Sequence, residues 1–288
     1  MSAASIPEAI QPARIRAGSI LRWPVVAGMT LIALSALFPL YFMTAGAFRT
    51  KLDWERSLVG WPTTTSMQAF HDAWVSGHIS LYFRNSAVVT SGTIALTLIT
   101  ATLGGYAFSK LNWRGKSACY FFVLAWMAVP PLVLMVPIYV EMVQLHLMNT
   151  YWSVILLYTA INLPFNCYLM AAFFRSVPDE LIEAARMDGA SIHATFLRVM
   201  VPIAKPAIAT LCIFNILYVW NEFLFALLLL SSDNVKTLTV GVLQMQGRFF
   251  YNYPALMAGL LIASLPVVGV YLVFQKYLIR AVAAGALK

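Results

Sequence analysis

Charged residues are rare along this chain, and they separate long stretches of apolar sequence. Six stretches without Lys, Arg, Asp or Glu cover residues 23–48, 85–109, 117–140, 142–174, 206–221 and 249–275. A helix needs about 20 apolar residues to cross the hydrocarbon core of a bilayer. Five stretches meet this length, and the stretch 206–221 meets it if its helix continues past Glu222 to Leu230. We predict an all-α integral membrane protein with six transmembrane helices, near 23–47, 85–109, 118–140, 151–174, 204–230 and 256–278.

The composition agrees with a membrane protein. Hydrophobic residues make up 61% of the 288 residues and charged residues 10%, whereas a soluble domain is about half apolar and about one quarter charged. The first apolar stretch follows a polar leader, is longer than the apolar region of a signal peptide, and lacks a clear cleavage site. We therefore expect a cytoplasmic leader, 1–22, and a transmembrane domain, 23–288, whose first helix is a retained anchor.

Basic residues set the expected orientation, because cytoplasmic loops are enriched in Lys and Arg. If both termini are cytoplasmic, the outer loops hold a minority of the 19 basic residues, namely Arg49, Lys51, Arg56, Arg84, Lys236 and Arg248. We therefore predict that both termini, and the loop between the fourth and fifth helices, are cytoplasmic. Five prolines fall within the predicted helices, where static kinks are favoured over hinges: Pro130, Pro131, Pro164, Pro206 and Pro266.

The remaining composition excludes several classes of function. Cytoplasmic loops explain the net charge of +8, so no nucleic acid partner is expected. The cysteines lie in apolar stretches without CxxC spacing and indicate neither a disulfide framework nor a metal site; they are Cys119, Cys167 and Cys212. The histidines lie outside the predicted helix interiors, without the spacing of metal ligands or of a hydrolase motif; they are His71, His78, His146 and His193.

The loop between the fourth and fifth predicted helices, 178–200, is polar and contains residues typical of helix starts and ends. Ser176, with Pro178 and Asp179 after it, fits a helix start. Gly189 suits the left-handed residue that ends a helix, and Ser191 suits the start of a second helix. We predict two short helices that lie under the membrane.

Two interpretations fit this pair of helices. Ala184 and Ala185 leave a bare surface between the charged residues Glu183 and Asp188, which favours the docking of another protein. Alternatively, the pair is an amphipathic element that rests on lipid headgroups. The acidic residues favour docking, because anionic lipid attracts basic faces.

The same loop resembles the EAA motif of membrane subunits in binding-protein-dependent ABC importers. The motif corresponds to Glu183-Ala184-Ala185, three residues, Gly189, nine residues, and then Val199-Met200-Val201-Pro202; the family pattern ends Ile-x-Leu-Pro, so the two valines are conservative departures. "MDGAS" at 187–191 and "WNEFLFALLLL" at 220–230 are similar to the carbohydrate-uptake branch, as in the second membrane subunit of the maltose importer and its relatives. The resemblance covers most of the chain and is weakest over 1–80.

This resemblance implies a permease subunit in a bacterial inner membrane that imports a carbohydrate, most simply an oligosaccharide, by alternating access. Its partners would be a second, different membrane subunit, two cytoplasmic ATPase subunits that hold ATP and Mg²⁺, and an external binding protein. The region 178–200 would couple to the ATPases, through Glu183, Ala184, Ala185, Asp188 and Gly189. The chain would be no enzyme and bind no cofactor itself, since "RGKS" at 114–117 has Lys110 where a P-loop needs glycine.

Polar residues within two predicted helices are candidates for the substrate pathway. On the fourth helix they recur every four residues, and on the fifth they cluster near its outer end; they are Tyr158, Asn162 and Asn166, and Asn215, Tyr218, Trp220, Asn221 and Glu222. Amides, a carboxylate and aromatic rings can bind sugar hydroxyls and C–H faces. Alternatively, such side chains connect helices through hydrogen bonds, and Glu222 serves as a cap or a gate.

The predicted outer loop 231–255 corresponds by position to a loop that, in the maltose-importer family, reaches into the binding protein. Its expected tip carries Gln246, Gly247, Arg248, Phe249, Tyr251 and Tyr253. The alternative is an ordinary aromatic loop at the membrane interface.

An ion-coupled secondary transporter is the alternative function. Such a protein usually carries an ionisable residue within the membrane and an internal repeat. Glu222 is the one candidate residue, and no clear repeat is present. The sequence does not indicate which sugar is carried.

Overall fold

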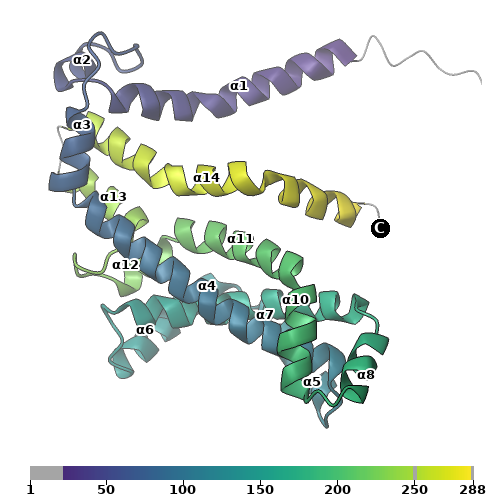
Figure 1. Ribbon diagram of the computed structural model, residues 1–288. Coiled ribbons are helices and arrows are strands. Elements are labelled where there is room, and N and C mark those ends of the chain that lie inside the picture. The colour runs from purple at the N-terminus through teal and green to yellow at the C-terminus, as the bar shows by residue number, and fades with distance from the viewer. Residues whose placement is uncertain (1–21, 249–251, 287–288) are drawn as a thin grey trace, which may run out of the picture.

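The computed structural model describes residues 22–248 and 252–286, and every regular element in this part of the chain is a helix. The longest helices are α1 (Arg22–Ala47), α4 (Ile79–Lys110), α7 (Tyr151–Ser176) and α14 (Tyr253–Ala286). Each contains an apolar stretch long enough to cross a membrane. Helices α1, α4 and α14 run from one end of the molecule to the other (Figure 1). The four long helices include the expected helices 23–47, 85–109, 151–174 and 256–278.

A further membrane-length segment is bent by 91° between its two halves. Its helices are α5 (Lys116–Ala125), η3 (Trp126–Ala128), η4 (Pro131–Leu134) and α6 (Met135–Gln144). Pro130 and Pro131 lie at the bend, where they lack the N–H groups that a continuous helix requires. The stretch 118–140, expected as one helix, is therefore divided into two.

A second segment bends by 72° between Ile203 and Lys205. Its helices are α9 (Ile192–Thr195), η5 (Phe196–Met200), α10 (Val201–Ile203) and α11 (Lys205–Asn221). The expected helix 204–230 is also interrupted, because Glu222 has an extended backbone and α12 (Leu224–Leu229) starts after it. The described chain thus holds four membrane-length helices, or six if each bent pair is one span.

Helices α4 and α7 pack against each other along most of their length. A Cβ atom added at Gly105 would lie 2.5 Å from Cβ of Met170 and 2.9 Å from the backbone nitrogen of Ala171. Glycine at this position therefore lets the two backbones come into contact, as small residues do between membrane helices.

We expect Gly105→Ala to lower the apparent unfolding temperature of the protein in detergent. The added methyl group meets backbone atoms of α7, and overpacking of this kind costs roughly 1–3 kcal/mol. Gly28→Ala on α1 is the matched control, because a Cβ atom there has nothing within 4 Å. Equal unfolding temperatures of the two variants in a thermal scan would contradict the close packing of α4 on α7.

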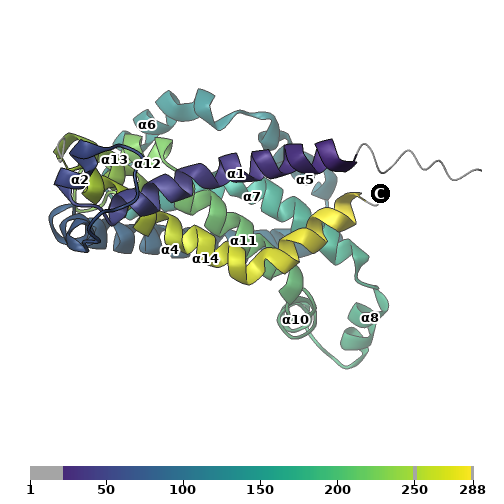
Figure 2. The same cartoon turned by 90° about the horizontal axis from the view of Figure 1, so that it is seen from above.

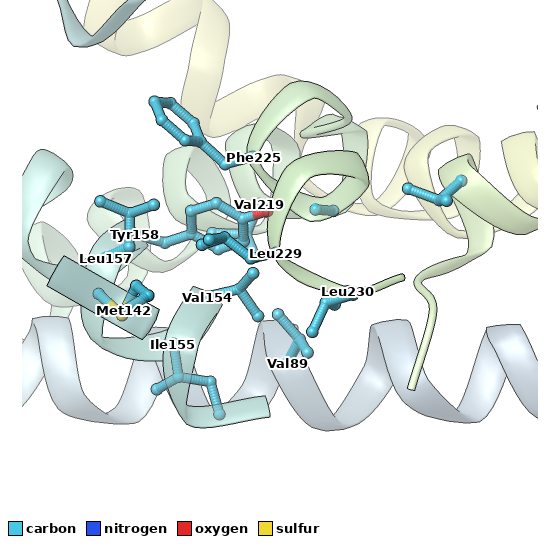
Figure 3. Close-up of a cluster of buried hydrophobic side chains, with 12 residues drawn as sticks. Val89, Met142, Val154, Ile155, Leu157, Tyr158, Val219, Phe225, Leu229 and Leu230 are labelled. Carbon is cyan, nitrogen blue, oxygen red and sulfur yellow. The ribbon is translucent and has the colours of Figure 1, made fainter. Parts of the chain in front are cut away.

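An apolar cluster joins α4, α7 and α11 to α12. It includes Val89, Tyr158, Val219 and Leu229, all nearly inaccessible to solvent (Figure 3). The cluster fixes the short helix α12 against the long helices, while Glu222 at the break before α12 is half-buried.

Helix α1 packs against α14 and leaves most of its apolar side chains exposed. The described start of α1 and the end of α14 lie at the same end of the molecule as α8 (Glu180–Met187), hereafter the α8 end (Figures 1 and 2). The opposite end, hereafter the α13 end, holds α2 (Lys51–Arg56), α3 (Gln68–His71), η2 (Asp72–Ser76) and α13 (Leu238–Arg248).

The connection from α1 to α4 at the α13 end is held by polar contacts. Thr63 donates a hydrogen bond to the carboxylate of Asp53, and the backbone N–H of Thr64 donates another. These bonds, that of Thr63 first, lower the pKa of Asp53 below its ordinary value. The guanidinium of Arg49 lies 5.9 Å from the ring centroid of Trp54 in the same connection.

Candidate functional site

Helix α8 carries the segment that resembles the EAA motif, and Gly189 ends it. The φ angle of Gly189 is +80°, in the left-handed region. Its N–H donates to the carbonyl of Arg186 at 2.9 Å, and the N–H of Ala190 donates to the carbonyl of Ala185 at 2.9 Å. These two bonds form a Schellman motif, so the expected left-handed glycine is confirmed.

The starts of the two short helices differ in how well the sequence predicted them. Helix α8 begins after Asp179, whereas Ser176 is the last residue of α7 and donates its hydroxyl to the carbonyl of Phe173. The expected cap at Ser176 is therefore wrong. Ser191 caps α9 as expected, because its hydroxyl oxygen accepts the N–H of Ala194 at 3.2 Å.

Most of the predicted coupling residues face outward. Glu183, Ala184, Asp188 and Gly189 are exposed, and Ala185 is half-buried. Glu183 and Asp188 form no salt bridge with any residue that the structure describes. Figure 2 shows α8 projecting from the rest of the molecule. The two carboxylates are therefore available to a basic partner.

Ile182, which the sequence analysis did not single out, anchors α8 to the long helices. It is 6% exposed and belongs to a cluster with Tyr106 of α4, Phe174 of α7 and Phe196 of η5. The ring of Tyr106 lies 6.0 Å from that of Phe174 and 5.1 Å from that of Phe196. Leu181 and Ile182 are adjacent apolar residues, so the sequence could not indicate which one faces inward.

Glu222 interacts with the protein itself. The Tyr158 hydroxyl donates to its carboxylate, and the N–H groups of Phe225 and Ala226 donate to it at 3.0 and 3.1 Å. These N–H groups belong to the first turn of α12, so Glu222 acts as the cap of that helix. This contact set favours the capping interpretation of Glu222.

Asn166 and Asn215 connect α7 to α11. Both are nearly inaccessible, at 2% and 1% exposed. The amide of Asn215 donates to the side-chain oxygen of Asn166 at 2.7 Å and to the carbonyl of Leu211 at 2.7 Å. Asn162 is half-buried and donates to the carbonyl of Tyr158 at 2.8 Å. The buried pair thus forms an interhelical bond of the kind that stabilises membrane helices.

Three of the candidate pathway residues lie near the end of α11, and they differ in exposure. Trp220 is 7% exposed and donates its ring N–H to the carbonyl of Ala263 at 3.1 Å. Tyr218, which is 38% exposed, and the exposed Asn221 lie three positions apart on one face of the helix. These two side chains have surface available for a ligand.

Three cavities are lined by residues other than these candidates. Their volumes are about 530, 370 and 320 Å³. The largest lies between Trp74, Phe83 and Pro266 and is almost entirely apolar, which does not suit sugar hydroxyls. None of these three cavities encloses the predicted pathway residues.

The expected outer loop 231–255 is partly helical, because residues 238–248 form α13. Three of the six predicted contact residues are the last residues of α13: Gln246, Gly247 and Arg248. Phe249 and Tyr251 lie outside the described residues, and Tyr253 is the first residue of α14. The ring of Tyr253 stacks on that of Trp54, with 5.6 Å between centroids.

Comparison with known proteins gives two relatives of nearly full length. MelC of Bacillus subtilis (strain 168), a melibiose/raffinose/stachyose import permease protein, is 31% identical over 259 residues, which are 90% of this chain and 94% of MelC. AraQ of Halalkalibacterium halodurans, an arabinooligosaccharides transport system permease protein, is 30% identical over 275 residues, which are 93% of this chain and 97% of AraQ.

A solved structure shows the same fold. A chain in the crystal structure of a bacterial ABC transporter involved in the import of the acidic polysaccharide alginate matches with a TM-score of 0.81 and 24% identity, over 93% of this chain and 99% of its own length. The relatives are transport permeases and not enzymes. The family model "Binding-protein-dependent transport system inner membrane component" matches residues 81–284. This family match to binding-protein-dependent transport systems decides against the ion-coupled secondary transporter. The chain therefore belongs to this family of inner-membrane components of binding-protein-dependent transport systems.

Proposed function

We propose that this chain is the permease subunit of an ATP-driven importer that takes up an oligosaccharide delivered by an external binding protein. The observation that carries the proposal is the exposed helix α8, which holds the EAA-like residues and ends in the Schellman motif of Gly189. MelC is named for melibiose, raffinose and stachyose, and AraQ for arabinooligosaccharides, which supports an oligosaccharide as the substrate class.

The proposed topology has six transmembrane spans in a bacterial inner membrane: the four long helices, the bent segment 116–144, and α11 with α12. Residues 178–200, which include the first part of the second bent pair, belong to the cytoplasmic coupling region. A leader, 1–22, precedes the transmembrane domain, 23–288, and both termini are cytoplasmic. The position of the described ends of α1 and α14 at the α8 end supports this arrangement (Figure 1). The α13 end then faces the external binding protein.

In this proposal the region 178–200 seats in a cleft of one of the two cytoplasmic ATPase subunits, which hold ATP and Mg²⁺. Glu183 and Asp188 are exposed and without a salt bridge among the described residues, so a basic side chain of an ATPase can pair with Glu183. Ala184 leaves the approach of the ATPase backbone unobstructed. Closure of the ATPases on ATP would move α8 and switch the membrane helices between inward-open and outward-open states.

The substrate pathway is proposed to lie between this chain and a second, different membrane subunit. Tyr218 and Asn221 are the candidates on α11 with exposed surface, and Asn162 is half-buried. The three cavities described above are lined by other residues, which supports a wall completed by the second subunit. Residues 246–253, at the end of α13 and the start of α14, are the proposed contact with the binding protein.

A cross-link from α8 to a co-expressed ATPase subunit tests the proposed function. We expect Ala184→Cys, in a background without Cys119, Cys167 and Cys212 and labelled with a thiol-reactive photo-cross-linker, to form a covalent bond to the ATPase in a yield that changes when ATP is added. Ala184 is exposed, so its replacement leaves the interior packing unchanged. Cross-linked product on a non-reducing gel is the measurement.

Asn234→Cys is the matched control for this cross-link, since it is also exposed but lies between α12 and α13. No bond to an ATPase is expected from this position. If Ala184→Cys reacts with a small cytoplasmic thiol reagent and still bonds to no ATPase, α8 is a surface helix and the proposed function is wrong.

A further inference from the structure

The last residue of α4 binds the connection between α7 and α8. Nζ of Lys110 lies 2.6 Å from the carbonyl oxygen of Val177 and 2.5 Å from Oδ1 of Asp179. The Lys110 side chain is 6% exposed, whereas that of Asp179 is 74% exposed. The buried ammonium of Lys110 therefore binds both ends of the short connection 177–179, while the carboxylate of Asp179 is exposed to solvent.

This contact restricts the motion of α8 relative to the end of α4. Val177 has an extended backbone, with φ −77° and ψ 127°, so the chain is not helical between Ser176 and Glu180. Without the ammonium, the apolar contacts of Ile182 would still join α8 to the long helices, but the connection itself could bend without moving the end of α4. With it, a displacement of α8 acts directly on the end of α4.

The other end of α4 binds the segment that leads into α13. Asn85 is inaccessible to solvent, and its amide donates to the carbonyls of Asn234 and Lys236, both at 2.9 Å. The hydroxyl oxygen of Ser86 accepts the N–H of Leu238, the first residue of α13, at 2.8 Å. The segment 234–238 is thus fixed to α4 by three hydrogen bonds with buried side chains of α4.

Helix α4 is one continuous helix of 32 residues, and the 25 residue steps from Asn85 to Lys110 span about 38 Å at 1.5 Å per residue. Gly105 brings it into backbone contact with α7, and Tyr106 belongs to the same apolar cluster as Ile182 of α8. A helix supported in this way moves as a rigid body, and Figure 1 shows it reaching from beside α8 to beside α13.

We propose that α4 transmits the displacement of α8 to the segment 234–238, and that Lys110 is the positioning residue that attaches α4 to the coupling segment. This inference rests on the proposed function, because the ATPases supply the displacement. It assigns a role in coupling to Lys110 and Asn85, at opposite ends of a helix outside the EAA-like region.

A spin label on Asn234→Cys tests the inference, in the complete transporter in proteoliposomes and in the background without native cysteines. The side chain of Asn234 is exposed, and Asn85 binds the backbone carbonyl oxygen of Asn234. Replacing and labelling the side chain therefore leaves that hydrogen bond in place. We expect ATP with vanadate to change the spectrum of the parent. Lys110→Met should reduce this change by at least about fivefold, the lower range of energetic coupling between sites. Lys110→Arg, which keeps a cationic donor, should show the same ATP-dependent spectral change as the parent.

Lys116→Met is the matched control, because Nζ of Lys116 binds the carbonyl of Leu111 and not the connection to α8. Its spectral change should equal that of the parent. Co-purification with the ATPases and their basal hydrolysis should be unaffected in the three lysine variants, Lys110→Met, Lys110→Arg and Lys116→Met. If the transporter with Lys110→Met fails to assemble, Asp179→Asn is the variant used in its place. Asp179 is exposed, and this substitution removes the salt bridge to Lys110.

The outcomes separate the inference from the proposed function. A full ATP-dependent change in Lys110→Met, or in Asp179→Asn where it is the variant used, overturns the role of Lys110 and leaves the proposed function in place. A parent that binds no ATPase or shows no ATP-dependent change overturns both. A reduced change in Lys116→Met as well would show a general effect of lost positive charge and would also overturn the inference.

Discussion

Gly189→Asp is expected to reduce oligosaccharide uptake by roughly tenfold or more, a typical size for lost coupling between sites, while the ATPases remain assembled and active. Gly189 has φ +80°, a conformation that costs an ordinary L-residue about 1–2 kcal/mol. The aspartate would also place a third carboxylate beside Glu183 and Asp188 on the exposed side of α8. Uptake of labelled raffinose or another oligosaccharide that the parent carries, divided by ATP hydrolysed, measures the effect.

Gly115→Asp separates backbone strain from the loss of coupling. Gly115 has φ +83°, and a Cβ atom there, as at Gly189, has nothing within 4 Å. The two variants therefore carry the same kind of strain, but Gly115 starts α5 and lies outside the EAA-like region. Equal losses of uptake in both variants would mean that the strain alone is responsible and that Gly189 has no special role in coupling.

Local rules predicted much of this fold. The four long helices follow from charge-free stretches of sufficient length, because a membrane helix satisfies its backbone internally. The turn at Gly189 follows from the preference of glycine for the left-handed conformation that ends a helix. Both signals lie within a few residues of the feature that they predict.

The features that the sequence did not predict depend on residues far apart in the chain. Glu222 interrupts the expected helix 204–230, and its partner Tyr158 comes from a different helix. Lys110 follows the apolar stretch 85–109, and nothing near it in the sequence indicates Asp179 as its partner. Such contacts are set by the packing of α4, α7 and α11, which one sequence alone does not specify.

Glu222→Ala is expected to destabilise the protein by about 2–4 kcal/mol, seen as a lower apparent unfolding temperature in detergent. The change removes a helix cap, worth roughly 0.5–2 kcal/mol, and leaves the buried hydroxyl of Tyr158 without this acceptor, at roughly 1–3 kcal/mol. Glu222→Gln keeps an acceptor oxygen and is expected to lose less. A thermal scan of the two variants beside the parent makes the comparison.

A double variant then decides whether Glu222 acts on Tyr158 or on the substrate. In the Glu222→Ala background the Tyr158 hydroxyl has already lost this acceptor, so Tyr158→Phe should cost less there than in the parent. The expected difference is roughly 0.5–3 kcal/mol, the range for residues in direct contact. Additive losses would mean that the two side chains do not stabilise each other. If Glu222→Ala instead kept the unfolding temperature and lost only uptake, the carboxylate would face the transported sugar, and the break between α11 and α12 would belong to the pathway.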